Sequence, residues 1–152
     1  MKVADTKRPF LATFHASNTE SALSRYVVNV MAANENVSRN YVMNFACNTI
    51  KFVVNQRILV DGTKKVVRID EIRGTEERGE ITVPVINPIF KFIPDSNGLD
   101  AEKKINGMHV QVGTISESTQ KLLLEAGATK DEIEILVRKA SPENVIAGSY
   151  DI

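Results

Sequence analysis

The chain has 152 residues, of which 43% are hydrophobic and 25% charged, and this composition is typical of a globular domain that buries a real core. Nineteen basic residues balance nineteen acidic ones, so bulk electrostatics gives no support for a nucleic-acid partner. A single cysteine, Cys47, excludes an intrachain disulfide. The sequence has neither a signal-peptide pattern nor an apolar run of about 18 residues, so we expect a cytoplasmic protein without membrane insertion.

The first third of the chain predicts two helices. An apolar run over residues 10–14 is suited to a buried strand, and Ser17 with Glu20 three residues later forms a capping-box pattern. We therefore expect a helix over residues 17–33 and place His15 at the strand-to-helix turn before it. A second helix is predicted over residues 38–47, with Ser38 as its N-cap and Cys47 as a buried apolar residue.

From residue 49 onward the hydrophobic period changes from helical to extended. The dipeptide Asp61-Gly62 separates two β-rich runs and predicts a two-residue hairpin turn, in which both residues accept positive φ, with the returning strand over residues 65–73. A third strand begins at Ile81, and Pro84 marks it as an edge or bulged strand because proline cannot donate to a ladder. We expect a three-stranded antiparallel meander whose apolar face is covered by the two helices.

The last third of the chain predicts a loop and two helices. Turn-forming residues at 95–98 predict an exposed, mobile loop over residues 94–107, followed by a short extended piece over 109–115. Helices are predicted over 116–125 and 129–138, capped by Ser116 and Thr129. The expected fold is α/β in the α+β sense: helices on a small, mostly antiparallel sheet in residues 1–94, then a loop and a C-terminal helical pair in residues 95–152.

The segment before and inside the first helix resembles a known motif. Its pattern, Thr-x-His-Ala-Ser-x-x-x-x-Ala-Leu-x-Arg over residues 13–25, resembles the histidine box of the type II/type IV secretion ATPases. Residues 48–54, 61–72 and 88–92 are similar, in the same order, to the strands that follow this box in the tight-adherence (Flp) pilus-assembly branch. The clear similarity spans residues 11–93, and a weaker one spans 107–128.

This resemblance implies part of a RecA-like, usually hexameric motor that uses ATP and Mg²⁺. The family's nucleotide-binding motifs, Walker A, an acidic box and Walker B, lie upstream of the histidine box and are not found in this sequence. Gly74 and Gly79 have the Walker A spacing, but Glu80 and Ile81 stand where lysine and serine or threonine are needed. The resemblance therefore implies the C-terminal part of such an ATPase, which we expect to be inactive alone.

The resemblance also implies roles for the box residues. His15 would lie near the nucleotide phosphates and relay nucleotide state, while Thr13 and Ser17 place the turn. Arg25 is either a solvated side chain or a contact to the nucleotide or an adjoining subunit. We assign no catalytic residue to the chain in isolation.

Other candidate groups receive structural interpretations. The neighbouring carboxylates Asp70 and Glu71 lie on opposite faces of a strand and cannot act as one acid/base pair. His109 has no second histidine or cysteine at a metal-ligand spacing, so no metal site is predicted. Lys64, Lys65 and Arg68 are expected to be a solvated strand face.

Two functional hypotheses follow from the resemblance. In the first, the chain is a segment of a secretion, pilus-assembly or conjugation ATPase, and its partners are the upstream ATPase half, other ring subunits and the membrane components of the system. It would then lie at the inner face of the membrane through those partners. In the second, it is a free-standing, non-catalytic interaction module of such a system. An independent small enzyme has the least support because the sequence shows no nucleophile–base or metal constellation. An exposed apolar sheet edge would permit self-association.

Overall fold

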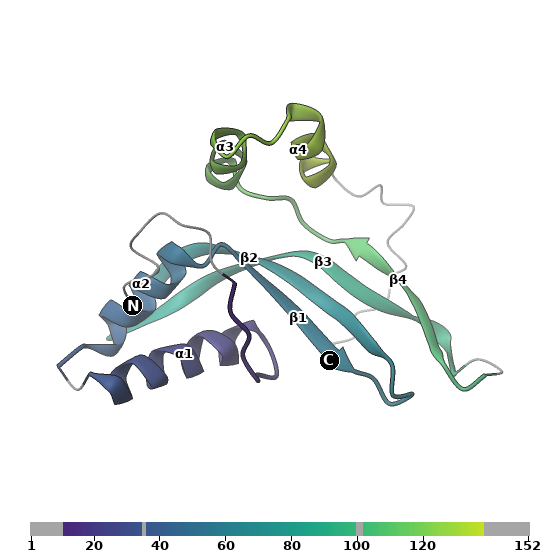
Figure 1. Cartoon of the computed structure of the whole chain (residues 1–152), viewed down its shortest axis with the longest axis horizontal. Helices are drawn as coiled ribbons and strands as arrows, with labels where there is room; N and C mark the ends of the chain where they lie inside the picture. Colours follow the sequence, from purple (N-terminus) through teal and green to yellow (C-terminus); the bar gives the residue numbers. More distant parts are fainter. Residues whose placement is uncertain (1–10, 35, 100–101, 139–152) are drawn as a thin grey trace. The chain divides into compact units, whose positions relative to one another are not determined.

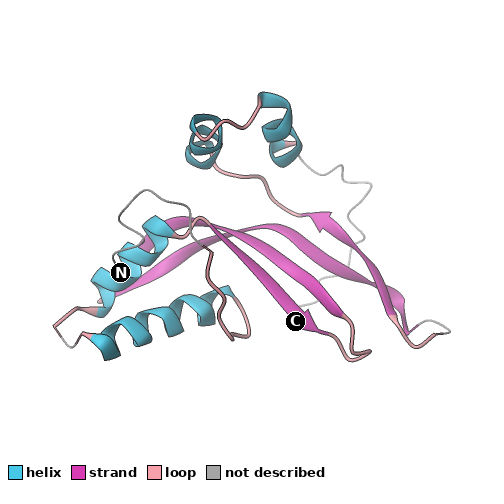
Figure 2. Ribbon diagram, in the orientation of Figure 1, coloured by secondary structure: helices cyan, strands magenta, loops and turns pink. Residues whose placement is uncertain are grey.

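The computed structural model describes residues 11–34, 36–99 and 102–138, which form a mixed α/β structure with an antiparallel four-stranded sheet in the order β1-β2-β3-β4 (Figures 1 and 2). The strands are β1 Phe52–Ile58, β2 Lys64–Arg78, β3 Ile81–Leu99 and β4 Ile105–Gln111. The helices are α1 Thr19–Ala33, α2 Arg39–Thr49, α3 Glu117–Glu125 and α4 Lys130–Val137. The chain divides into two compact units, residues 1–53 with 72–86 and residues 54–71 with 87–152.

The first unit holds the two N-terminal helices, which lie side by side (Figure 2). The side chain of Ser38 accepts a hydrogen bond from the Tyr41 backbone N–H and caps α2, as predicted. The apolar faces of α1 and α2 pack with the second half of β2. The buried residues of this core are Leu23, Val27, Val42, Met43, Ala46, Cys47 and Ile72. Cys47 is therefore a buried apolar residue, as its helical position predicts.

The beginning of α2 fixes the β2–β3 turn. The Asn40 side chain donates to the Glu80 carbonyl at 2.9 Å and accepts from the Thr82 backbone N–H at 3.1 Å. Arg39 Nη1 donates to the Thr82 carbonyl at 3.2 Å. Thr82 is fully buried, so the bonds to its N–H and to its carbonyl satisfy backbone groups that water does not reach.

The second unit contains a hairpin at the predicted place, but not the expected two-residue turn, because Asp61 does not have a positive φ and the Gly62 N–H donates to the Leu59 carbonyl. The Leu59 N–H donates to the Thr63 carbonyl at 2.8 Å, and Gly62 has the positive φ of 77° that favours glycine there. The Asp61 carboxylate accepts from the Ile105 N–H at 2.7 Å and from the Thr63 N–H at 2.9 Å. The bond from Ile105 is the main reason that the pKa of Asp61 falls to about 2, so an ionised carboxylate ties this turn to the beginning of β4.

The C-terminal helical pair is also confirmed. Ser116 caps α3, and Thr129 with Glu132 forms a complete capping box at the beginning of α4. The buried residues Ile89, Ile115 and Ile133 form the core of this unit, so α3 and α4 pack with the second half of β3.

The long strand β3 corrects the predicted loop over residues 94–107. It continues through Leu99, and the extended piece predicted near His109 is β4, which pairs with it in an antiparallel register that matches Phe92 with His109. The described β3–β4 pairs begin at Phe90, so Pro84 and Pro88 precede that ladder and need no N–H for it. Pro94 borders a register shift. The predicted edge character around Pro84 is therefore local to one part of the strand.

The segment before α1 corrects two further predictions. Residues 11–16 form no strand, and Leu11 is 96% exposed and Phe14 43% exposed; Phe10 lies outside the described residues. The N-cap of α1 is Asn18 instead of Ser17, because the Asn18 side-chain oxygen accepts from the Ser21 N–H at 2.8 Å. His15 therefore does not lie at a strand-to-helix turn. A strand needs a neighbour for its backbone groups, and the described sheet places none beside this run.

Candidate functional site

The histidine-box segment lies against α1 within the first unit. Arg25 Nη1 donates to the backbone carbonyl of His15. The Phe14 ring meets the Tyr26 ring edge-to-face, with a centroid distance of 6.1 Å and an interplanar angle of 72°. Successive residues of the segment are thus held by successive residues of α1, so its place relative to this helix is defined.

All four residues singled out from the sequence are exposed. The structure brings His15 and Arg25 together, but the arginine contacts the histidine backbone and not its imidazole. Ser17 Oγ lies 3.1 Å from Ser21 Oγ at the beginning of the helix, and Thr13 is exposed two residues before His15. The arrangement thus leaves the His15 ring accessible to a group that comes from outside the described residues. Its role toward a nucleotide stays a prediction.

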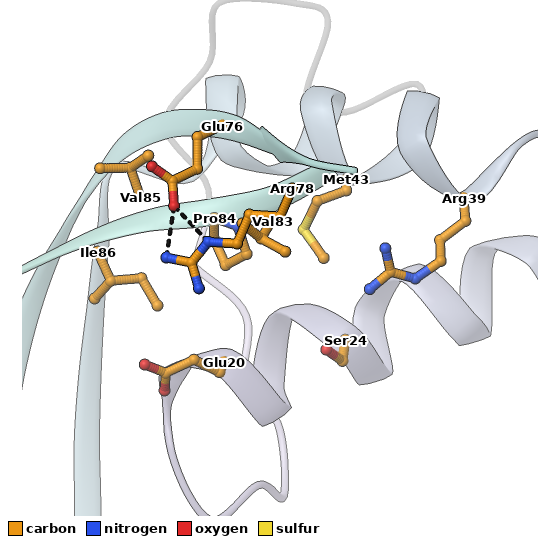
Figure 3. Close-up of a pocket in the computed structure, with 10 residues that line it drawn as sticks. All are labelled: Glu20, Ser24, Arg39, Met43, Glu76, Arg78, Val83, Pro84, Val85 and Ile86. Atoms are coloured by element: carbon orange, nitrogen blue, oxygen red, sulfur yellow. Dashed lines mark hydrogen bonds and ion pairs between the residues drawn. The ribbon is translucent and has the colours of Figure 1, made fainter. Parts of the chain in front are cut away.

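A second candidate site is an open cavity of about 540 Å³ within the first unit (Figure 3). Figure 3 shows Glu20 and Ser24 projecting from α1 on one side, with Glu76 and Arg78 on β2 on the other. Its lining residues come from four elements: Glu20, Ser24, Arg39, Met43, Glu76, Arg78, Val83, Pro84, Val85 and Ile86. Five apolar side chains are thus combined with two carboxylates and two guanidinium groups.

The charges around this cavity balance. Arg78 bonds Glu76 through two nitrogens, Nη2 at 2.6 Å and Nε at 2.7 Å, and both side chains are largely exposed, so this ion pair adds little stability. Sequence reasoning missed the site because the predicted strand ended at residue 73, whereas β2 continues through Arg78 and carries Glu76 and Arg78 to the cavity. A cavity of this composition suits a ligand of mixed charge with an apolar part.

A buried carboxylate organises the second unit. Glu71 has no solvent exposure and accepts from Ser116 Oγ at 2.5 Å, from the Ser116 N–H at 3.0 Å and from Asn87 Nδ2 at 2.8 Å. Burial alone raises the pKa of Glu71, but the hydrogen bonds from Ser116, Thr119 and Asn87 outweigh this effect and lower it to about 2. Glu71 is therefore a charged structural anchor for the beginning of α3.

The neighbouring carboxylate has other partners. Asp70 is also fully buried and accepts from Arg68 Nε at 2.5 Å and from Asn55 Nδ2 at 3.4 Å. Arg68 and Asn55 are different residues from those that donate to Glu71. This agrees with the prediction that the two carboxylates do not form one acid/base pair. Arg68 is consequently tied into the sheet and is not merely part of a solvated face.

The described residues at the Walker-like glycines do not have the geometry of a phosphate-binding loop. Gly74 lies inside β2 and Gly79 in the turn after it, so neither belongs to a loop that leads into a helix and cradles phosphate. Among the described residues, no group of three or more histidine, cysteine, aspartate or glutamate side chains could hold a metal ion. Nor does the described part contain a helix of the length and apolarity required to span a membrane.

Comparison with known proteins does not place this chain in a family, so a functional assignment depends on the chain's own residues. Neither a protein-family model nor a curated protein matches this sequence. The histidine-box similarity rests on the pattern over residues 13–25 and on the strand segments that follow it, and the function that it implies is a proposal.

Proposed function

We propose that this chain is the non-hydrolysing C-terminal part of a secretion, pilus-assembly or conjugation ATPase, a partial RecA-like unit from the histidine box onward. The observation that carries the proposal is the exposed box segment, in which Arg25 holds the His15 backbone and the imidazole remains accessible. Leu11, in the same segment, is 96% exposed, as expected for a residue that packs on a part of the motor outside the described residues.

The proposal divides the work between two parts of the motor. The upstream ATPase half, or a neighbouring ring subunit, supplies the Walker motifs that bind ATP and Mg²⁺. This chain supplies His15, whose imidazole can hydrogen-bond a phosphate oxygen, and Arg25, whose guanidinium carries further N–H donors beyond the one that bonds the His15 carbonyl. Through its partners the motor would act at the cytoplasmic face of a membrane.

The test uses the assembly that contains this chain in its source cells. The assembly is isolated with an antibody against the chain, and its ATP turnover is measured with His15→Ala introduced at the native locus. We expect turnover to fall about a hundredfold, the lower end of the range for loss of one catalytic hydrogen-bonding group. The chain alone, incubated with Mg²⁺ and ATP, should show no turnover above background.

Asn29→Ala is the matched control, because Asn29 is an exposed residue on the same helix as Arg25. It should leave turnover unchanged. An assembly with no ATPase activity, or one equally active with and without His15, would contradict the proposal. Turnover by the chain alone would contradict the claim that it does not hydrolyse ATP.

The second candidate is a free-standing, non-catalytic interaction module of a secretion or conjugation system. The mixed-charge cavity between α1 and β2 favours it, because this cavity could bind a segment of a partner without catalysing a reaction. The mass of the native product separates the two candidates. A band several-fold heavier than 16.8 kDa on an immunoblot supports the ATPase part, and a band at 16.8 kDa supports the module.

A further inference from the structure

The first strand carries an unusual row of exposed side chains. β1 forms one edge of the described sheet (Figure 1), and its side chains alternate strictly between exposed and half-buried. The exposed row of the strand consists of Phe52, Val54, Gln56 and Ile58. Val54 is 59% exposed and Ile58 68%. Three apolar side chains therefore face solvent along this edge of the described sheet.

The row from Val54 to Ile58 is symmetric about Gln56. If a second copy of β1 is laid antiparallel to the first with Gln56 opposite Gln56, Val54 faces Ile58 of the other copy. Phe52 lies beyond this pairing, because Leu59 to Gly62 form the hairpin turn and Val60 is not part of the strand. Directly opposed side chains of antiparallel strands have Cβ atoms about 5 Å apart, so Val54 of each copy meets Ile58 of the other. The one polar residue meets itself, and a glutamine amide both donates and accepts hydrogen bonds.

The charged residue of β1 fits the same register. Arg57, the only charged residue within the strand, falls opposite Asn55 instead of another arginine. Asp61 lies in the hairpin turn and its carboxylate is bonded to Ile105 and Thr63, so the register does not extend to it. Within the strand the register opposes no like charges.

The edge also lacks the usual protection against pairing. Natural edge strands are protected by lysines, prolines, bulges or short length. β1 has seven residues, without lysine or proline, and its alternation is regular throughout. Backbone groups along such an edge are a template for another strand.

We propose that two copies of this chain associate through β1, paired antiparallel about Gln56, so that one sheet continues through both copies. The contact is isologous, because the same residues face each other from both sides and the pairing closes at a dimer. This proposal does not depend on the proposed function, since it rests on β1 alone.

The test is the mass of the full chain in solution, measured by sedimentation equilibrium over a range of concentrations. We expect a reversible dimer of twice the 16.8 kDa chain mass. Gln56→Lys and Gln56→Glu each place two like charges at the centre and should weaken association about tenfold. An equimolar mixture of the two variants should restore it as a heterodimer, because lysine then faces glutamate.

Met108→Lys is the matched control, since Met108 is a half-exposed residue on β4 at the other edge of the sheet. It should leave the dimer intact. Circular dichroism checks that each variant is folded. If Gln56→Lys disturbs the fold, Gln56→Cys gives a second measurement, because only the residue on the symmetry axis can form a disulfide with its own copy at this spacing.

Three results would overturn the proposal. The first is a monomer at every concentration. The second is a dimer that Met108→Lys disrupts and Gln56→Lys does not. The third is a mixture of the lysine and glutamate variants that stays as weakly associated as either variant alone.

Discussion

Glu71 shows how one side chain can fix the position of an element distant in sequence. The residue is fully buried in β2, yet its carboxylate is ionised because Ser116, Thr119 and Asn87 donate to it. Ser116 caps α3 at the same time, so the carboxylate and the first turn of the helix share this residue. A buried charge of this kind is stable only while its donors stay in place.

We predict that Glu71→Gln lowers the free energy of unfolding by about 1.5–3 kcal/mol, the usual range for hydrogen bonds to a charged group. The amide keeps the shape of the side chain but loses the charge and places N–H donors toward Ser116. Urea unfolding at neutral pH measures the change. Glu125→Gln, on the exposed face of α3, is the control and should stay within about 0.5 kcal/mol of the parent.

The same carboxylate predicts a dependence of stability on pH. The pKa of Glu71 is about 2 in the folded chain against an ordinary value of 4.5, so the ionised form stabilises the fold fully above about pH 4.5. This contribution is lost as the pH falls from 4.5 toward 2. Glu71→Gln should therefore lose less stability than the parent over this range. Equal losses would show that folding does not lower the pKa of Glu71.

Individual functional residues were only partly visible in the sequence. Alternation along the strand correctly separated Asp70 from Glu71, because neighbouring strand residues point to opposite faces. Their partners were not predictable, since Ser116 lies 45 residues from Glu71. The residues that line the cavity come from four elements, so no sequence spacing marks them. A sequence motif does not show whether a side chain is exposed, so the exposure of His15 could not be predicted either.

At the scale of elements, local signals decided which predictions were correct. The caps at Ser38, Ser116 and Thr129 and the place of the hairpin at Asp61-Gly62 are each set by a few neighbouring residues, and the structure confirms them. The expected strand before α1 and the expected loop after residue 94 both depended on neighbours in space. Pairing with β4 extends β3 beyond Pro94 to Leu99, and the turn-forming residues 95–98 lie in the register shift between these two paired positions.

The hydrogen bonds from α2 to the β2–β3 turn can be tested for their contribution to stability. We predict that Asn40→Ala lowers the free energy of unfolding by about 1–2 kcal/mol, because it removes an acceptor from the part-buried Thr82 N–H and a donor from the Glu80 carbonyl. Hydrogen exchange at the Thr82 amide should be faster in the variant than in the parent, while exchange in the rest of the chain stays unchanged.

Asn29→Ala is again the matched control, since it makes the same change in helix propensity at an exposed position of α1. It should be neutral or slightly stabilising. If Asn29→Ala lost as much stability as Asn40→Ala, the effect would come from the helix and not from the hydrogen bonds to the turn.

At the scale of the whole molecule, the chain builds two separate hydrophobic cores. One contains buried residues of α1, α2 and β2, and the other contains Ile89 of β3 with Ile115 and Ile133. The two cores share no residue, and each of the long strands β2 and β3 has residues in both compact units. A sequence of ordinary globular composition did not indicate this division, because composition counts apolar residues without showing how they cluster.

Because the two cores share no residue, we predict that mutations in each change the free energy of unfolding additively. Ile72→Val in the first core and Ile89→Val in the second each remove one methylene from a side chain that is 1% exposed, and each should lower the free energy of unfolding by about 0.5–1.5 kcal/mol. The double variant should equal the sum within about 0.5 kcal/mol, because residues without shared partners act independently. Urea unfolding of the four proteins under one set of conditions measures this cycle. A departure of more than about 1 kcal/mol would show that the two cores are coupled, and β2 and β3, which run through both units, would be the elements that couple them.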